Sequence, residues 1–141
     1  MMVRGLVDTS PARLRHWSVL AFGCWNAAIW LSRVRNILAD QGLDTAGKAL
    51  WMVPAMVFGL GGVAALWGWW KGPAGVARLL MAVLAATLLY WPIRVVFMLF
   101  DERSAAFRIV HLVLGVVSVG LALAITRRLV RTGRVPQGAF R

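Results

Sequence analysis

Four long apolar segments constrain the fold of this chain more than any other feature. They carry no Asp, Glu, Lys or Arg and comprise residues 17–32, 49–70, 79–93 and 109–126. A helix needs roughly 20 apolar residues to cross about 30 Å of hydrocarbon. With 60% hydrophobic and 15% charged residues in 141 positions, the chain has too little polar surface to cover a soluble domain. We therefore expect an all-α integral membrane protein with four transmembrane helices.

Local signals place the boundaries of these helices. The expected membrane domain spans residues 12–130, between an N-terminal segment 1–11 and a basic tail 131–141, and its helices cover about 12–38, 46–70, 76–100 and 106–128. Asp44 can cap the second helix. Pro54 and Pro92 fall inside expected helices, where each removes a backbone donor.

The charges are distributed unequally between the two expected faces of the membrane. One face has a net charge of +9, from Arg4, Arg13, Arg15, Lys71, Arg78, Arg127, Arg128, Arg131, Arg134 and Arg141 against Asp8. The other has a net charge of +2, from Arg33, Arg35, Lys48, Arg94, Arg103 and Arg108 against Asp40, Asp44, Asp101 and Glu102. The positive-inside rule then places both termini in the cytoplasm of a protein of the plasma membrane. Trp30, Trp51 and Trp91 fall at the outer interface.

The composition also indicates the partners. The basic tail is suited to anionic phospholipid at the cytoplasmic face, so we expect the lipid bilayer, and not nucleic acid, to receive the excess positive charge. A homo-oligomer or a larger membrane complex is a further possible partner. His16 and His111 fall near opposite faces and metal-ligand spacings are absent from the sequence, so we expect no cofactor and no metal.

One pattern occurs twice, 61 residues apart. When IWLSRVRNILAD (29–40) is set over YWPIRVVFMLFD (90–101), Trp, Arg and Asp coincide in one register. These residue types are scarce in apolar segments, so the coincidence favours two duplicated helical hairpins. Because each unit would have two spans, the copies would be parallel repeats.

Small residues inside the second and fourth segments, and Asn26 inside the first, indicate close helix packing. The candidate packing residues are Asn26, Ala55, Gly59, Ser118, Gly120 and Ala122. Packing within the four-helix bundle is the simpler interpretation, and a homodimer seam is the alternative. Asn26 is expected to form a hydrogen bond to a neighbouring helix.

The repeated arginines are the first candidate site. Arg33 follows Trp30 by three residues, and Arg94 follows Trp91 in the same way, so each pair could form a cation–π contact on one helical face. Parallel copies would place the two arginines at the same depth. Two interpretations are open: a paired site for an anion or lipid phosphate, or two anchors that reach outer headgroups.

A second candidate site is an outer-face polar cluster formed by Asp40, Asp101, Glu102 and His111. It would suit acid–base chemistry, although interfacial loops often carry such residues, and we expect no catalytic residue.

The sequence leaves three candidate functions for the protein. The first is a non-catalytic interaction or accessory subunit that packs against a membrane partner or lipid. The second is an oligomeric transporter or channel for an anionic species, and the third is a membrane enzyme.

Overall fold

The computed structural model describes residues 15–72, 75–100 and 104–133, with side chains to residue 130. Within these ranges the chain is all-helical and forms four helices: α2 (Trp17–Ala39), α3 (Thr45–Lys71), α4 (Val76–Leu99) and α5 (Ala105–Gly133). The expected all-α fold with four helices is therefore confirmed for the part of the chain that the structure describes.

Two of the helices begin at a polar cap. The backbone N–H of Gly47 donates to Asp44 Oδ1 at 2.8 Å, which confirms Asp44 as the cap of α3. At the start of α2, the backbone N–H of Ser18 donates to His16 Nδ1 at 3.3 Å. α2 therefore begins at Trp17, five residues after the expected start at residue 12.

Glycine ends α3 and shapes the turn that follows. Gly72 has a φ of 60° at the C-terminus of α3, and Gly75 has a φ of 96° just before α4. Both values are in the left-handed region, which glycine tolerates because it has no Cβ. At the other end of the chain, α5 continues to Gly133 and so enters the expected basic tail.

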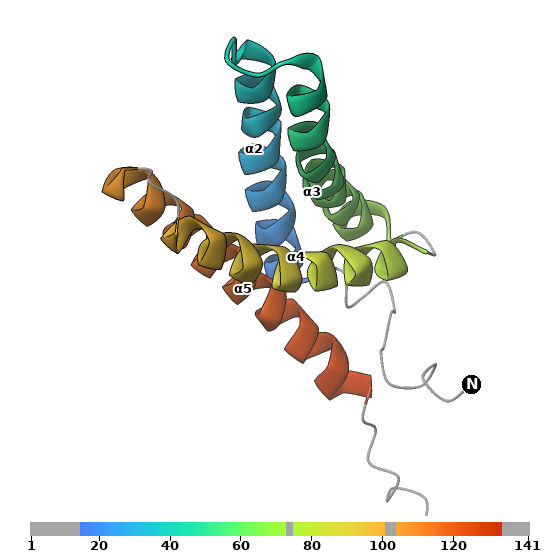
Figure 1. Ribbon diagram of the computed structural model, residues 1–141. Helices are drawn as coiled ribbons and strands as arrows, with labels where there is room; N and C mark the ends of the chain where they lie inside the picture. The colour runs from blue at the N-terminus through green and yellow to red at the C-terminus, as the bar shows by residue number, and fades with distance from the viewer. Residues whose placement is uncertain (1–14, 73–74, 101–103, 134–141) are drawn as a thin grey trace, which may run out of the picture.

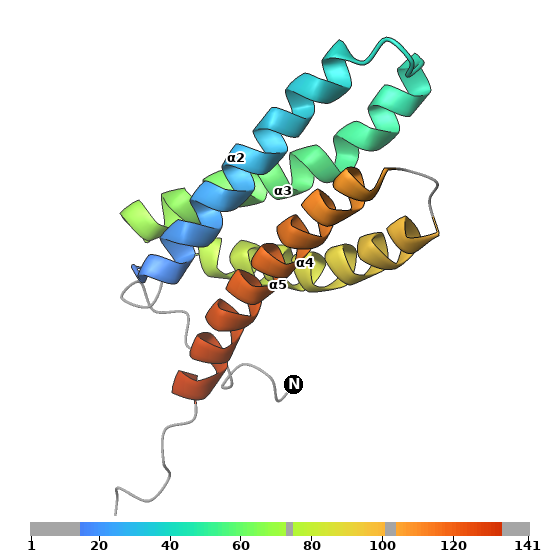
Figure 2. The ribbon, with the colours of Figure 1, turned by 90° about the vertical axis from the view of Figure 1, so that its left-hand side faces the viewer.

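The four helices form two antiparallel hairpins. α2 packs along α3 and α4 packs along α5, while α3 also contacts α4 and α2 contacts α5. Figure 1 shows the two hairpins crossing at a steep angle, so that they diverge from one another toward their tips. In Figure 2 the two tips lie on the same side of the molecule, opposite the N-terminus of α2 and the end of α5.

The closest helix contact lies between α2 and α3. A Cβ on Gly62 would lie 2.6 Å from the backbone nitrogen of Ala27, and one on Gly23 would lie 2.8 Å from the side chain of Leu66. Only glycine permits this approach, in the way that small residues allow membrane helices to pack. Toward the hairpin tip, Trp30 of α2 then stacks on Phe58 of α3, with ring centroids 4.9 Å apart.

Three of the described helices are long and apolar enough to cross a membrane: α3, α4 and residues 105–130 of α5. Large hydrophobic side chains are exposed along all three, which suits lipid contact. α2 has the length of a span but is less apolar, because Asn26, Arg33 and Arg35 lie in it.

We predict that alanine destabilises the protein at Gly62 but not at Gly120. Gly62→Ala forces α2 away from α3 and should lower the free energy of unfolding by about 1–3 kcal/mol, as overpacking does. Gly120→Ala is the matched control, because nothing lies within 4 Å of its added Cβ. Unfolding in a mild detergent measures both, and equal stability of the two variants would contradict the close contact.

Candidate functional site

Two arginines from different hairpins meet at the ring of Trp51. The guanidinium carbon of Arg33, on α2, lies 6.0 Å from the centroid of this ring, and that of Arg94, on α4, lies 5.0 Å away. Cation–π attraction operates within about 6 Å of the centroid. Trp51 on α3 is therefore within cation–π distance of both arginines.

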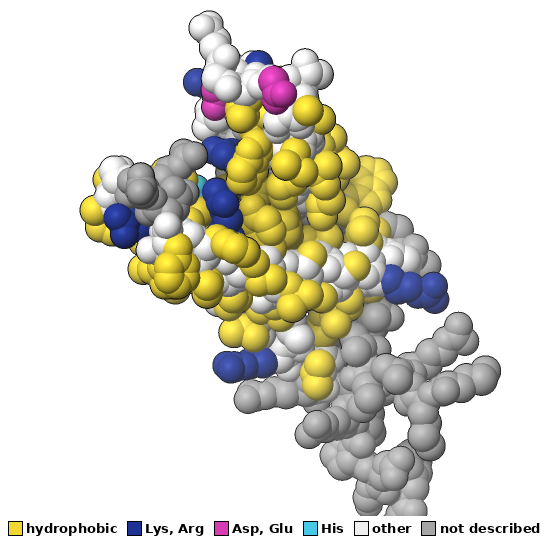
Figure 3. Space-filling view, in the orientation of Figure 1, with side chains coloured by type: hydrophobic (Ala, Val, Ile, Leu, Met, Phe, Trp, Pro, Cys, Tyr) yellow, Lys and Arg dark blue, Asp and Glu magenta, His cyan; other side chains and the backbone are white. Residues whose placement is uncertain are grey.

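The arginines line a pocket of about 190 Å³ between the hairpin tips. Its lining residues are Ile29, Trp30, Ser32, Arg33, Asn36, Trp51, Pro54, Tyr90, Trp91, Arg94, His111 and Leu114. All four helices contribute, and none of these residues is acidic. Figure 3 shows basic side chains gathered in the notch between the two hairpins.

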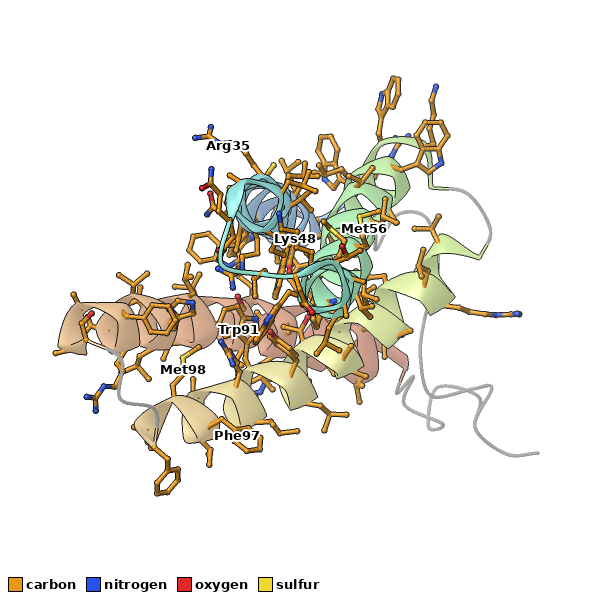
Figure 4. The ribbon with its side chains drawn as sticks, turned by 45° about the horizontal axis from the view of Figure 1, so that its top comes forward. Arg35, Lys48, Met56, Trp91, Phe97 and Met98 are labelled. Carbon is orange, nitrogen blue, oxygen red and sulfur yellow. The ribbon has the colours of Figure 1, made fainter. Side chains whose placement is uncertain are left out.

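An aromatic cluster forms the inner wall of the pocket. The rings of Trp30 and Trp91 lie 6.1 Å apart, and Tyr90 contacts both of them. Trp91 points toward the centre of the bundle in Figure 4, and only 3% of its surface is exposed. Its Nε1–H has no hydrogen-bond partner among the described residues. A buried donor without an acceptor costs free energy.

The polar side chains of the pocket are neutral or basic. The Nδ1 of His111 is 2.9 Å from the carbonyl oxygen of Phe107, which can only accept, so Nδ1 carries the proton. Ser32 Oγ donates to the carbonyl oxygen of Ile29 at 2.7 Å. Hydrogen-bond donors for a ligand are therefore available from the two guanidinium groups and the side-chain amide of Asn36, whereas the protons of Ser32 Oγ and His111 Nδ1 are used within their own helices.

The structure brings together the four residues of the repeated motif. Trp30, Arg33, Trp91 and Arg94 all line the one pocket. The cation–π partner differs from the expectation, however, because both arginines contact Trp51 instead of the Trp three residues before each of them. Trp51 has no equivalent in the second copy of the motif, and its expected position at the outer interface was the only signal for it.

Only Asp40 and His111 of the expected outer-face polar cluster lie among the described residues, so the cluster stays a prediction. Asp40 Oδ1 accepts a hydrogen bond from the backbone N–H of Gly42 at 2.9 Å, and Asp40 does not line the pocket. Asp101 and Glu102 lie outside the described residues. His111 lines the arginine pocket.

Most of the candidate packing residues are buried. Ala55, Gly59, Ser118 and Ala122 are buried, and Ser118 Oγ accepts a hydrogen bond from Trp25 Nε1 at 2.9 Å. Gly120 is an exception, because it is exposed on the outer face of α5 and contacts no other helix.

Asn26 is buried but does not bond as expected. Its Nδ2 donates to the carbonyl oxygen of Phe22 on its own helix at 3.0 Å, rather than to a neighbouring helix. Its Oδ1 has no partner among the described residues. The nearby Gly62 contact brings the backbones of α2 and α3 so close that the side chain lies against its own helix.

No protein-family model matches the chain, and no curated protein and no solved structure matches it. The function is therefore argued from the pocket alone.

We predict a measurable coupling between Trp51 and Arg94. In a double-mutant cycle of Trp51→Leu and Arg94→Gln, the coupling in the free energy of unfolding should be about 0.5–2 kcal/mol. The same cycle with Arg33→Gln should give a smaller value, because Arg33 lies farther from the ring. If the effects of Trp51→Leu and Arg94→Gln on the free energy of unfolding are additive, the cation–π contact does not stabilise the protein.

Proposed function

We propose that this protein binds an anionic group, of the phosphate or carboxylate class, between its two hairpins near the outer face of the membrane. One observation carries the proposal: Arg33 and Arg94 converge on Trp51, and none of the described residues that line their pocket is acidic.

The electrostatics support an anion. Two guanidinium groups near the same ring repel one another, and a charge within a membrane protein is expensive unless it is paired or reaches water. The ring attracts both cations but does not neutralise them. An anion between the arginines would remove the repulsion, and a guanidinium group can donate two parallel hydrogen bonds to a phosphate or carboxylate.

Arg35 shows what an anchoring arginine looks like on the same helix. It is exposed and points away from the bundle in Figure 4. Arg33 and Arg94 are instead half-buried between helices. This contrast favours the binding interpretation of the arginine pair over the headgroup anchor, which Arg35 fits better.

The proposed function is binding without catalysis, in a protein that acts as an interaction or accessory subunit. The pocket presents two guanidinium groups, which favour binding of an anion. Transport of the anion is the alternative role for the same pocket, and it would require a pathway supplied by an oligomer.

We further propose that α2 is a fourth span and that both termini are cytoplasmic. Arg15 donates to the carbonyl oxygen of Trp70 at 3.2 Å, and Lys71 Nζ lies 4.1 Å from the ring centroid of Trp70. Basic and aromatic residues thus meet at the end of the molecule opposite the hairpin tips, as they do at a cytoplasmic interface.

The helix boundaries support the duplication. Subtracting 61 from the bounds of α4, 76–99, gives 15–38, against 17–39 for α2. The same subtraction from α5, 105–133, gives 44–72, against 45–71 for α3. The contacts between the hairpins agree with it, because exchanging the hairpins turns the α3–α4 contact into the α5–α2 contact, whereas α2 and α3 pack more closely than α4 and α5.

Anion binding is tested with inorganic phosphate. Phosphate, compared with chloride at equal ionic strength, should raise the unfolding temperature of the wild type in a neutral detergent. Arg33→Gln/Arg94→Gln should weaken apparent phosphate affinity by about tenfold or more, because hydrogen bonds to charged groups contribute roughly 1.5–3 kcal/mol each. The matched control is Arg35→Gln/Arg78→Gln, which removes the same charge from two exposed positions.

Two outcomes would refute the proposal. In the first, the wild type shows no phosphate-specific shift. In the second, the control variant loses as much affinity as the pocket variant, which would show that net charge alone governs the effect.

Topology is tested with single cysteines in a Cys24→Ser background. Gln41→Cys and Ser104→Cys should react with a membrane-impermeant maleimide on intact cells. Lys71→Cys should react only after permeabilisation. If positions 41 and 104 label from opposite sides, the parallel-repeat topology is wrong.

A further inference from the structure

An apolar groove adjoins the arginine pocket. It runs between α3 and α4 with a volume of about 630 Å³. Its lining residues are Leu50, Trp51, Val53, Pro54, Val57, Phe58, Ala86, Leu89, Tyr90, Ile93, Arg94 and Phe97. Trp51, Pro54, Tyr90 and Arg94 line both cavities, so the groove and the pocket share a wall.

The groove changes from charged to apolar along its length. Arg94 is the only charged residue among those that line it. Leu50 and Arg94 lie toward the hairpin tips, whereas Val57, Phe58 and Ala86 lie deeper along the helices. From Arg94 inward to Ala86 the groove follows α4 for roughly 12 Å, at 1.5 Å per residue. This length holds part of an acyl chain.

The groove is open toward the surroundings of the protein. Leu50 is 71% exposed and Leu89 is 67% exposed, from opposite walls. Figure 3 shows a continuous hydrophobic surface over α3 and α4, next to the notch that holds the basic side chains. A chain entering from the bilayer can therefore reach the groove sideways, without crossing a polar surface.

We propose that the ligand of the arginine pocket is an anionic lipid whose acyl chain lies in the α3–α4 groove. The inference rests on the proposed function, because it takes the anionic group bound by Arg33 and Arg94 to be the headgroup of that lipid. Trp51 and Tyr90 then lie where headgroup and chain join, the level at which amphipathic aromatic residues are enriched.

Charge and shape together identify this occupant. A soluble anion would use the pocket and leave the groove unused, and an uncharged chain would use the groove and leave both arginines unpaired. An anionic lipid is complementary to both cavities. Its headgroup would occupy the arginine pocket near the hairpin tips, and its acyl chain would occupy the groove toward the membrane interior.

The test uses native mass spectrometry of the full chain in a neutral detergent, with lipids of matched chain length. The wild type should bind phosphatidic acid about tenfold or more tightly than either phosphatidylcholine or diacylglycerol, because only the first offers both an uncompensated negative charge and a chain. Equal binding of the three lipids would overturn the proposal.

Groove variants separate the two cavities. Val57→Trp/Leu89→Trp fills the groove from both walls and should reduce phosphatidic acid binding about tenfold, while the phosphate-dependent rise in unfolding temperature remains. Leu60→Trp/Val96→Trp is the matched control, since these residues are exposed on the same helices but do not line the groove. It should bind phosphatidic acid like the wild type.

The outcomes distinguish this inference from the proposed function. If the groove variant binds phosphatidic acid as well as its control does, the lipid inference is wrong, although phosphate binding by the arginines can still stand. If Arg33→Gln/Arg94→Gln leaves both phosphate and phosphatidic acid binding unchanged, both proposals are wrong.

Discussion

The close approach of α2 to α3 fixes the geometry of the half of the molecule that carries the hairpin tips. At Gly62 the two backbones are in contact, which sets the register in which the antiparallel helices continue. One turn farther, Trp30 stacks on Phe58, and near the hairpin tip Arg33 reaches Trp51. α4 then packs against this hairpin through Tyr90 and Trp91 and brings Arg94 to the same ring. The geometry of the pocket thus depends on a glycine contact farther along the same hairpin.

Between the Gly62 contact and the hairpin tips, the charges of the two arginines limit how the helices can pack. Aromatic stacking fills the space between the hairpins up to the level of the arginines, where the packing gives way to a cavity. A bundle with an apolar side chain at this level could close completely, as packed interiors do. The two arginines lie at this level instead, and the buried indole N–H of Trp91 has no partner among the described residues.

Much of this architecture is readable in the sequence, because helix-forming apolar runs and their caps are local signals. Asp44 and the glycines at 72 and 75 end or begin helices through contacts with near neighbours. The pairing of Arg33 with Arg94 was also predictable, since the repeated motif predicts equal depth. The role of Trp51 was not, because it depends on how a third helix is rotated against two others. The orientation of Asn26 likewise depends on backbone distances that sequence spacing does not encode.

The pocket has a consequence for how the two halves of the molecule hold together. α2 and α3 contribute one arginine and the aromatic support, whereas α4 and α5 contribute the other arginine and His111, so neither hairpin possesses the site alone. Under the proposed function, an anion in the pocket contacts both hairpins and would stabilise their joined arrangement by mass action. Its occupancy and the angle between the hairpins would then be thermodynamically linked.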